Sequence, residues 1–288
     1  MIVITGATGL LGRQIVEQLL TRHPADHIGV SVRDPNKADD LGKRGVRVRQ
    51  ADYSDPASLV HSFEGATQVL IVSANSIGEE AVRGHRNAIE AAREAGARRV
   101  LYSSHMGANP SSPFPPMPDH AATEAILRES GMAYTSLRNG FYASSGIMHL
   151  RAALTTGEVA APQDGPVSWT AHADLAEAAA IILTDEGRFD GPTPALTASE
   201  ALDLDDMVSI TSEVLGRPVR RVTISDDEYR ANMTSHGLPE ALGDMLVGLF
   251  AASRNKEFAA TDPTLPALLG RPTTPFRTVI ESSLSAPN

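Results

Sequence analysis

Residues 1–20 read MIVITGATGLLGRQIVEQLL, and this stretch decides the fold of the chain. The apolar, β-branched run Ile2–Ile4 predicts a short buried strand. A turn that contains Gly6, Gly9 and Gly12 follows at once, and apolar residues at helical spacing come after it. A strand, a glycine turn and a helix in this order indicate a binding site for the pyrophosphate of a dinucleotide.

The three glycines have separate physical roles in such a turn. Gly6 permits a tight bend after the strand, Gly9 leaves room for a pyrophosphate beside the backbone N–H groups, and Gly12 lets the helix pack close to the sheet. The helix N-terminus adds unpaired N–H groups and a partial positive charge. A turn that needs glycines only for its own geometry is the weaker alternative. We therefore expect the phosphates to bind at Gly6, Ala7, Thr8, Gly9, Leu10 and Leu11.

The composition narrows the class of protein. The chain has 288 residues, enough for one large domain or two lobes. Its net charge of −10 argues against nucleic acid as a partner. It has no cysteine, which excludes disulfides and thiolate chemistry and fits a cytoplasmic protein. No apolar stretch is long enough to span a membrane, and the spacing of the nine histidines indicates no metal site.

The pattern of the first 142 residues alternates between strands and helices. Strands are expected at residues 27–32, 46–50, 68–72, 99–102 and 133–137, and helices at residues 37–45, 56–64, 79–95 and 119–131. Such alternation predicts an α/β fold, a Rossmann-type doubly wound parallel sheet with right-handed crossovers. The proline-rich stretch 109–118 is expected to be a loop over the ligand-binding edge of the sheet or a plain surface loop, with Asp119 capping the next helix.

After Tyr142 the alternation weakens. Helices are expected at residues 172–183, 204–215, 226–235 and 240–252, short strands at 195–197 and 219–222, and a loose tail at 282–288. We therefore expect a Rossmann domain at residues 1–142 and a smaller, helix-rich lobe at residues 143–288 that covers the ligand cleft. Part of the lobe, about residues 165–200, is expected to pack back on the sheet.

The chain resembles the NmrA-like group of atypical short-chain dehydrogenases/reductases, over nearly its whole length. The motifs that carry the resemblance are ITGATG at residues 4–9, VRDP at 32–35, VRQADY at 48–53, HRN at 85–87 and YTSLRNG at 134–140. Within the group it looks most like flavin-free bacterial quinone reductases, with triphenylmethane reductases a close second. The resemblance implies a Rossmann fold and a nicotinamide cofactor.

The residues after the second strand favour NADP(H) over NAD(H). Arg33 stands where a carboxylate would favour NAD, and Lys37 follows one turn later. A guanidinium suits a 2′-phosphate because it can donate paired hydrogen bonds. Asp34 is adjacent and acidic, but we expect it to cap the turn before Pro35.

The resemblance also suggests the remaining contacts to the cofactor. Asp52 fits the family's contact to the adenine edge, although a turn-forming role is equally compatible with the sequence. The ends of the fourth and fifth strands and the turn after the sixth complete the expected cofactor site, with Ser73, Ala74, Asn75, Ser103, Asn139, Gly140 and Phe141.

The catalytic pair of the superfamily is missing. Most short-chain dehydrogenases use a serine with Tyr-x-x-x-Lys, whereas the matching helix here carries His120 and Glu124 at the two places. A quinone or a cationic dye takes a hydride directly and needs no strong acid, so we identify no catalytic residue. His120 is expected either to donate a proton or, more in keeping with the pattern, to lie on the helix surface. His120, Tyr142 and Trp169 are the candidate acceptor contacts, and ordinary packing explains the two aromatics equally well.

Two classes of function follow. In the first, the protein is an NADPH-dependent reductase of a quinone-like or other flat acceptor. In the second, it is a regulator that senses NADP(H) without turnover, since loss of the tyrosine and lysine fits both classes. The sequence leaves the oligomeric state open, including a homodimer.

Overall fold

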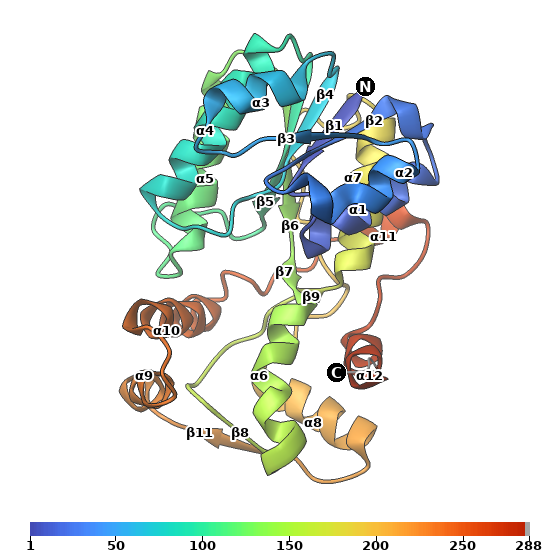
Figure 1. Ribbon diagram of the computed structural model, residues 1–288. Helices are drawn as coiled ribbons and strands as arrows, with labels where there is room; N and C mark the ends of the chain where they lie inside the picture. The colour runs from blue at the N-terminus through green and yellow to red at the C-terminus, as the bar shows by residue number, and fades with distance from the viewer. Residues whose placement is uncertain (286–288) are drawn as a thin grey trace.

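The computed structural model describes residues 1–285 of the chain, and a parallel sheet of seven strands forms its centre (Figure 1). The spatial order is β10-β6-β5-β4-β1-β2-β3, and every neighbouring pair is parallel. This order reverses between β1 and β4, as in doubly wound dinucleotide-binding sheets. The predicted fold class is confirmed. The strands are β1 (Ile2–Thr5), β2 (Ile28–Val32), β3 (Arg47–Gln50), β4 (Gln68–Ile71), β5 (Arg99–His105), β6 (Ala133–Asn139) and β10 (Gly191–Pro192).

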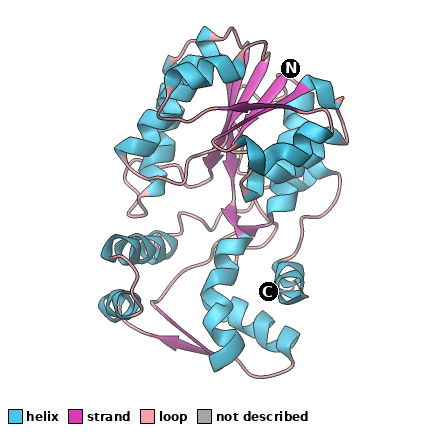
Figure 2. Ribbon diagram, viewed as in Figure 1, coloured by secondary structure: helices cyan, strands magenta, loops and turns pink. Residues whose placement is uncertain are grey.

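Helices cover both faces of this sheet (Figures 1 and 2). Alternate strand residues point to opposite sides, so Ile4 and Leu101 join one core cluster while Val3 and Val100 join the other. The first cluster packs under α1 (Leu10–Leu20), α2 (Asp39–Lys43), α7 (His172–Thr184) and α11 (Thr264–Leu269). The second packs under α3 (Pro56–Phe63), α4 (Glu79–Glu94) and α5 (Pro116–Glu129). Two 3₁₀ turns, η1 (Ala25–His27) and η2 (Pro35–Ala38), flank β2.

A helix-rich lobe lies below the sheet in Figure 1. A short parallel pair, β7 (Phe141–Tyr142) and β9 (Trp169–Thr170), joins it to the sheet. The lobe contains α6 (Ala143–Thr156), β8 (Glu158–Ala161), α8 (Leu204–Leu215), β11 (Arg220–Thr223), α9 (Asp226–Ser235), α10 (Glu240–Arg254) and α12 (Phe276–Ser285). Two elements that follow residue 142 in sequence belong to the sheet instead. Helix α7 packs on α1, and β10 pairs with β6. The division into two domains at residue 142 stays a prediction.

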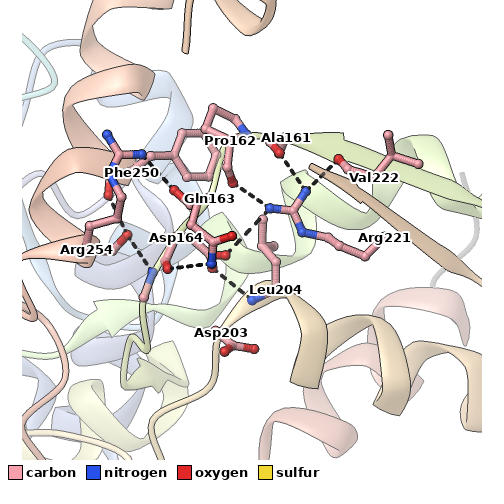
Figure 3. A network of polar contacts seen from close by, with 12 residues as sticks. Ala161, Pro162, Gln163, Asp164, Asp203, Leu204, Arg221, Val222, Phe250 and Arg254 are labelled. Carbon is pink, nitrogen blue, oxygen red and sulfur yellow. Dashed lines mark hydrogen bonds and ion pairs between the residues drawn. The ribbon is translucent and has the colours of Figure 1, made fainter. Parts of the chain in front are cut away.

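An ion pair in the lobe holds its strands to α8 (Figure 3). The buried Arg221 guanidinium donates to the carbonyls of Ala161 and Val222, and its Nη2 lies 3.6 Å from Asp164 Oδ1. The other carboxylate oxygen of Asp164 accepts the Leu204 N–H of α8 at 2.9 Å. Burial raises the pKa of Asp164 to about 6. Because neither charge lines the cavity described below, we assign this pair to joining the lobe's strands to α8 rather than to ligand binding.

Some local predictions are wrong. Helix α5 begins at Pro116 rather than Asp119, because prolines are tolerated in a first turn whose N–H groups have no helical partner. Asp119 does not cap this helix; its carboxylate accepts the Gly78 N–H at 2.7 Å. The strand expected at residues 195–197 is a single bridge from Leu196 to Asn139.

The lobe contains elements that the sequence patterns did not reveal. The sequence does not predict α6, β8 and α12 of the lobe, nor α11 on the sheet core, since α6 has no side-chain cap at its start and β8 is only four residues long. The expected loose tail begins inside α12, and residues 286–288 lie outside the described residues. Within residues 1–285, no helix is long and apolar enough to cross a membrane.

Candidate cofactor and acceptor site

A cavity of about 580 Å³ opens at the carboxyl ends of β1, β2 and β4, where the strand order reverses. Ligands of doubly wound sheets bind at such a point. Of the residues expected from the sequence, its lining includes Gly6, Thr8, Gly9, Leu10, Leu11, Arg33, Lys37, Asp52, Ser73, Ala74, Asn75 and Tyr142. The chain therefore gathers the glycine turn, the basic loop and the end of β4 around one space.

The glycines of the turn serve different purposes, since one is needed for packing and another leaves space for a ligand. Gly6 has a φ of +60°, and its carbonyl accepts the Gly9 N–H at 2.9 Å. A Cβ added at Gly12 would lie 2.3 Å from that same carbonyl oxygen, so Gly12 is required for packing. A Cβ at Gly9 would meet only this oxygen, at 3.3 Å, and would otherwise face the cavity. Ala7 is fully buried and lines no part of the cavity.

The N-terminus of α1 suits an anion. Gly9 is its N-cap and provides no side-chain hydrogen bond, and the first turn carries no acidic residue. The first N–H groups of the helix therefore keep their donors and their partial positive charge. This donor set fits a pyrophosphate.

The loop after β2 carries exposed positive charge. Within residues 1–285, neither Arg33 nor Lys37 forms an ion pair, and both line the cavity. Asp34 accepts the Asn36 N–H at 3.1 Å as N-cap of η2, which confirms its expected capping role. Arg33 and Lys37 are thus available to an anionic ligand.

Asp52 both forms a turn and lines the cavity. Its Oδ1 accepts the Ser54 N–H at 2.8 Å and the Ser54 hydroxyl at 2.6 Å. These hydrogen bonds, and to a smaller extent Arg33, hold the pKa of the Asp52 carboxyl below its usual value. The two expectations for Asp52 are therefore compatible with each other.

Ser103 and the turn after β6 lie behind the cavity wall. The buried Ser103 Oγ accepts the Ser73 N–H at 2.7 Å and so holds the loop after β4. A Cβ at Gly140 would lie 2.2 Å from Thr170 Oγ1, and the Phe141 ring packs against neighbouring rings in the lobe core. The cavity lining does not include Ser103, Gly140, Phe141 or the buried Asn139.

The cavity also contains residues that the sequence reasoning missed. Tyr53 donates its hydroxyl proton to the Val72 carbonyl at 2.6 Å, and Glu80 comes from the start of α4. His172, the first residue of α7, stacks on Tyr142 with ring centroids 4.2 Å apart. The VRQADY motif contained a signal for Tyr53, whereas nothing near His172 in sequence points to the cavity.

Two of the candidate acceptor contacts are placed differently from expectation. Trp169 is 5% exposed, donates its indole N–H to the Leu202 carbonyl at 3.1 Å and lies in the lobe core, so it offers no open face to an acceptor. His120 is half-buried and faces β5 rather than open solvent, since its Nδ1 lies 2.8 Å from the Tyr102 hydroxyl; this burial lowers its pKa to about 4. Neither side chain lines the cavity.

The place of the missing lysine is filled by a buried carboxylate that pairs with a half-buried arginine. Glu124 is 3% exposed and accepts from the Ser104 hydroxyl at 2.7 Å. Its carboxylate also accepts two hydrogen bonds from Arg138, at 2.7 and 3.1 Å. None of the three side chains lines the cavity. Among residues 1–285, no cluster of His, Asp and Glu could hold a metal ion.

The strand order, the glycine turn and the open helix N-terminus together define a dinucleotide-binding protein of the Rossmann type. A family profile described as NAD(P)H-binding matches residues 6–186. The chain belongs to this NAD(P)H-binding, NmrA-like family of oxidoreductases. The expectation of a nicotinamide cofactor is confirmed.

Known relatives cover nearly the whole chain. Quinone oxidoreductase 2 of Escherichia coli is 36% identical over 275 residues, or 95% of each chain. Its crystal structure in complex with NADPH has a TM-score of 0.93 and 34% identity, covering 99% of this chain and 100% of that one. The triphenylmethane reductase of Citrobacter sp. in complex with NADP(H) has a TM-score of 0.90 and 31% identity, covering 98% and 100%. The NAD(P)H azoreductase of Xenophilus azovorans is 31% identical, covering 96% of this chain and 95% of its own.

Proposed function

We propose that this protein is an NADPH-dependent reductase that transfers a hydride directly to a flat conjugated acceptor such as a quinone. The observation that carries the proposal is the single cavity that joins a phosphate-binding helix end to the stacked Tyr142–His172 pair. The named relatives support it, since their acceptors are quinones, azo compounds and triphenylmethane dyes. All three kinds of acceptor are extended conjugated systems.

Different residues around the cavity would bind different parts of the cofactor and the acceptor. The N-terminus of α1 would hold the pyrophosphate, and Arg33 with Lys37 would hold a 2′-phosphate. The loop Ser73–Asn75 would support the ribose beside the nicotinamide. The bound cofactor supplies the hydride, and the Tyr142–His172 pair would provide an aromatic face against which the acceptor lies flat.

Neither member of the Tyr142–His172 pair titrates near neutral pH. Burial lowers the pKa of His172 to about 4 and raises the pKa of Tyr142 to about 12, so both are neutral between these values. A hydride delivered to a quinone leaves an oxygen anion that water can protonate. Positioning of the acceptor is therefore the main contribution of these side chains.

The alternative is a regulator that senses NADP(H). A panel of quinones, azo dyes and triphenylmethane dyes, with loss of NADPH absorbance as the readout, separates the two functions. We expect turnover with at least one quinone. Tight NADPH binding without turnover on the whole panel would favour the sensor. A cytoplasmic location, a homodimer and the absence of a nucleic-acid partner remain predictions from the sequence.

Replacing Arg33 with alanine is expected to weaken NADPH binding by about 10- to 100-fold, the scale of a lost charge-assisted hydrogen-bond pair. NADH binding should hardly change, because NADH has no 2′-phosphate. The measurement is the dissociation constant of each cofactor, with Arg128→Ala on the exposed face of α5 as the matched control. A preference for NADPH that survives in the Arg33 variant contradicts this assignment.

Replacing His120 with alanine is expected to lower kcat by less than about tenfold, which is under ~1.4 kcal/mol of barrier. A general acid would contribute about 10²-fold or more. Because the pKa of His120 is lowered to about 4, the residue is neutral at physiological pH and should add no titration near neutrality. The measurement is the pH profile of kcat and KM. A large loss of kcat at unchanged KM would instead make His120 the proton donor.

A further inference from the structure

The loop Ser73–Gly78 follows β4 and forms one wall of the cofactor cavity. Side chains from other elements hold it through its backbone amides. Beyond the bond from the Ser73 N–H to Ser103, the Gly78 N–H donates to Asp119 of α5 at 2.7 Å. Between them, the Ala74 N–H donates to Nε2 of His85 at 2.9 Å. The loop that faces the cavity is therefore positioned by β5, α4 and α5 together.

The hydrogen bonds of His85 define its tautomer. Nε2 accepts from Ala74 and must be unprotonated, so Nδ1 carries the proton and donates to Thr123 Oγ1 at 2.9 Å. The Thr123 hydroxyl in turn donates to the Asp119 carbonyl at 2.8 Å. Every donor in this chain has an acceptor, and the chain runs in one direction from the cavity wall to α5.

The surroundings keep His85 neutral. The side chain is 2% exposed, and its ring lies 5.1 Å from the Tyr102 ring and 6.1 Å from the Tyr53 ring. Burial, with a smaller effect from His120, lowers its pKa to about 3. A protonated ring would turn Nε2 into a donor that faces the Ala74 N–H, so the contact requires the neutral form.

A histidine that merely fills the core would not need this contact. The Ala74 amide is next to Asn75, and both residues line the cavity. Without an acceptor, this partly buried N–H would lose its partner and the loop would move to find another. Such a movement changes the cavity wall directly, whereas the interior of the fold keeps its apolar contacts.

We propose that His85, held as the Nδ1–H tautomer, is a positioning residue that sets the Ala74–Asn75 segment against the ribose and nicotinamide of the cofactor. The inference rests on the proposed placement of NADPH in this cavity. It does not depend on the identity of the acceptor. His85 therefore acts through the loop, and no contact with the acceptor is required of it.

The binding test compares two variants of His85 with a control. His85→Leu removes the acceptor, and we expect NADPH affinity to fall about tenfold or more, the scale of one donor left without its partner. His85→Gln places Oε1 about where Nε2 lies and should restore most of the affinity. His149→Leu is the matched control, since His149 is an inward-facing histidine against Trp169 and Phe250 that touches neither loop nor cavity. It should bind NADPH as the native protein does.

The structural test uses the native protein without cofactor or acceptor. Nitrogen-15 NMR of the histidine rings should show one neutral histidine whose Nε2 is unprotonated and coupled across a hydrogen bond to the Ala74 amide. A protonated Nε2 would overturn the inference, as would equal NADPH affinity in the native protein and His85→Leu. If instead the NMR and affinity results hold and no acceptor is reduced, the proposed reductase function fails while the role of His85 stands. If His85→Leu does not fold, His85→Gln and the NMR measurement still decide.

Discussion

Replacing Gly9 with valine is expected to abolish binding of both NADPH and NADH while the protein stays folded. The side chain would project from the N-cap of α1 into the cavity, in the space where the pyrophosphate is expected. The fold should tolerate it at a small cost, because Gly9 has a φ of −85° and a Cβ there, 3.3 Å from the Gly6 carbonyl oxygen, requires that oxygen to shift by only a few tenths of an ångström. Calorimetric titration with each cofactor measures binding, and circular dichroism measures folding.

Gly12 provides the contrast to Gly9. A Cβ at Gly12 would lie 2.3 Å from the Gly6 carbonyl oxygen, which is backbone and cannot move aside cheaply. Gly12→Val should therefore lose stability first and cofactor binding only as a consequence. Cofactor binding that persists in a folded Gly9→Val protein would place the nucleotide outside this cavity.

Replacing Glu124 with lysine is expected to destabilise the protein strongly, although it restores the residue type that the superfamily carries at this place. The new ammonium would be buried beside the Arg138 guanidinium, which now donates two hydrogen bonds to the carboxylate. Removing one partner of a fully buried ion pair costs about 3–5 kcal/mol; the Arg138 side chain is 36% exposed, which lowers this cost, while a second cation adds repulsion. The measurement is the free energy of unfolding in urea.

Glu124→Gln is the matched control for this experiment. Its amide oxygen, in the place of Oε1, can still accept from Ser104 and from Nε of Arg138, so the loss of stability should be smaller. If the lysine variant is as stable as the glutamine variant, the pocket has room for the family's lysine. The loss of the catalytic pair would then need an explanation other than the ion pair.

The parts of the fold that depend on neighbouring residues could be predicted from the sequence. The strand Ile2–Thr5, the glycine turn and α1 are adjacent in the chain, so their order alone indicates the phosphate site. The regular alternation up to β6 likewise predicts the parallel sheet. Each crossover helix returns the chain to the end of the sheet where the previous strand began, so the next strand runs in the same direction. The capping role of Asp34 was predictable for the same reason, since its partner Asn36 is two residues away.

Only the tertiary structure decided which distant residues meet. The spacing of apolar residues shows which side of an element faces inward, but it does not show which neighbours that side contacts. An aromatic residue has the same local signal in a core and in a cavity wall, so Trp169 and Tyr142 could be separated only by their burial and contacts. The sequence by itself therefore determined the fold class and the phosphate-binding turn, which are local. The tertiary structure brought His172 to Tyr142 and Arg138 to Glu124, because these contacts join segments whose separation in the chain carries no local signal.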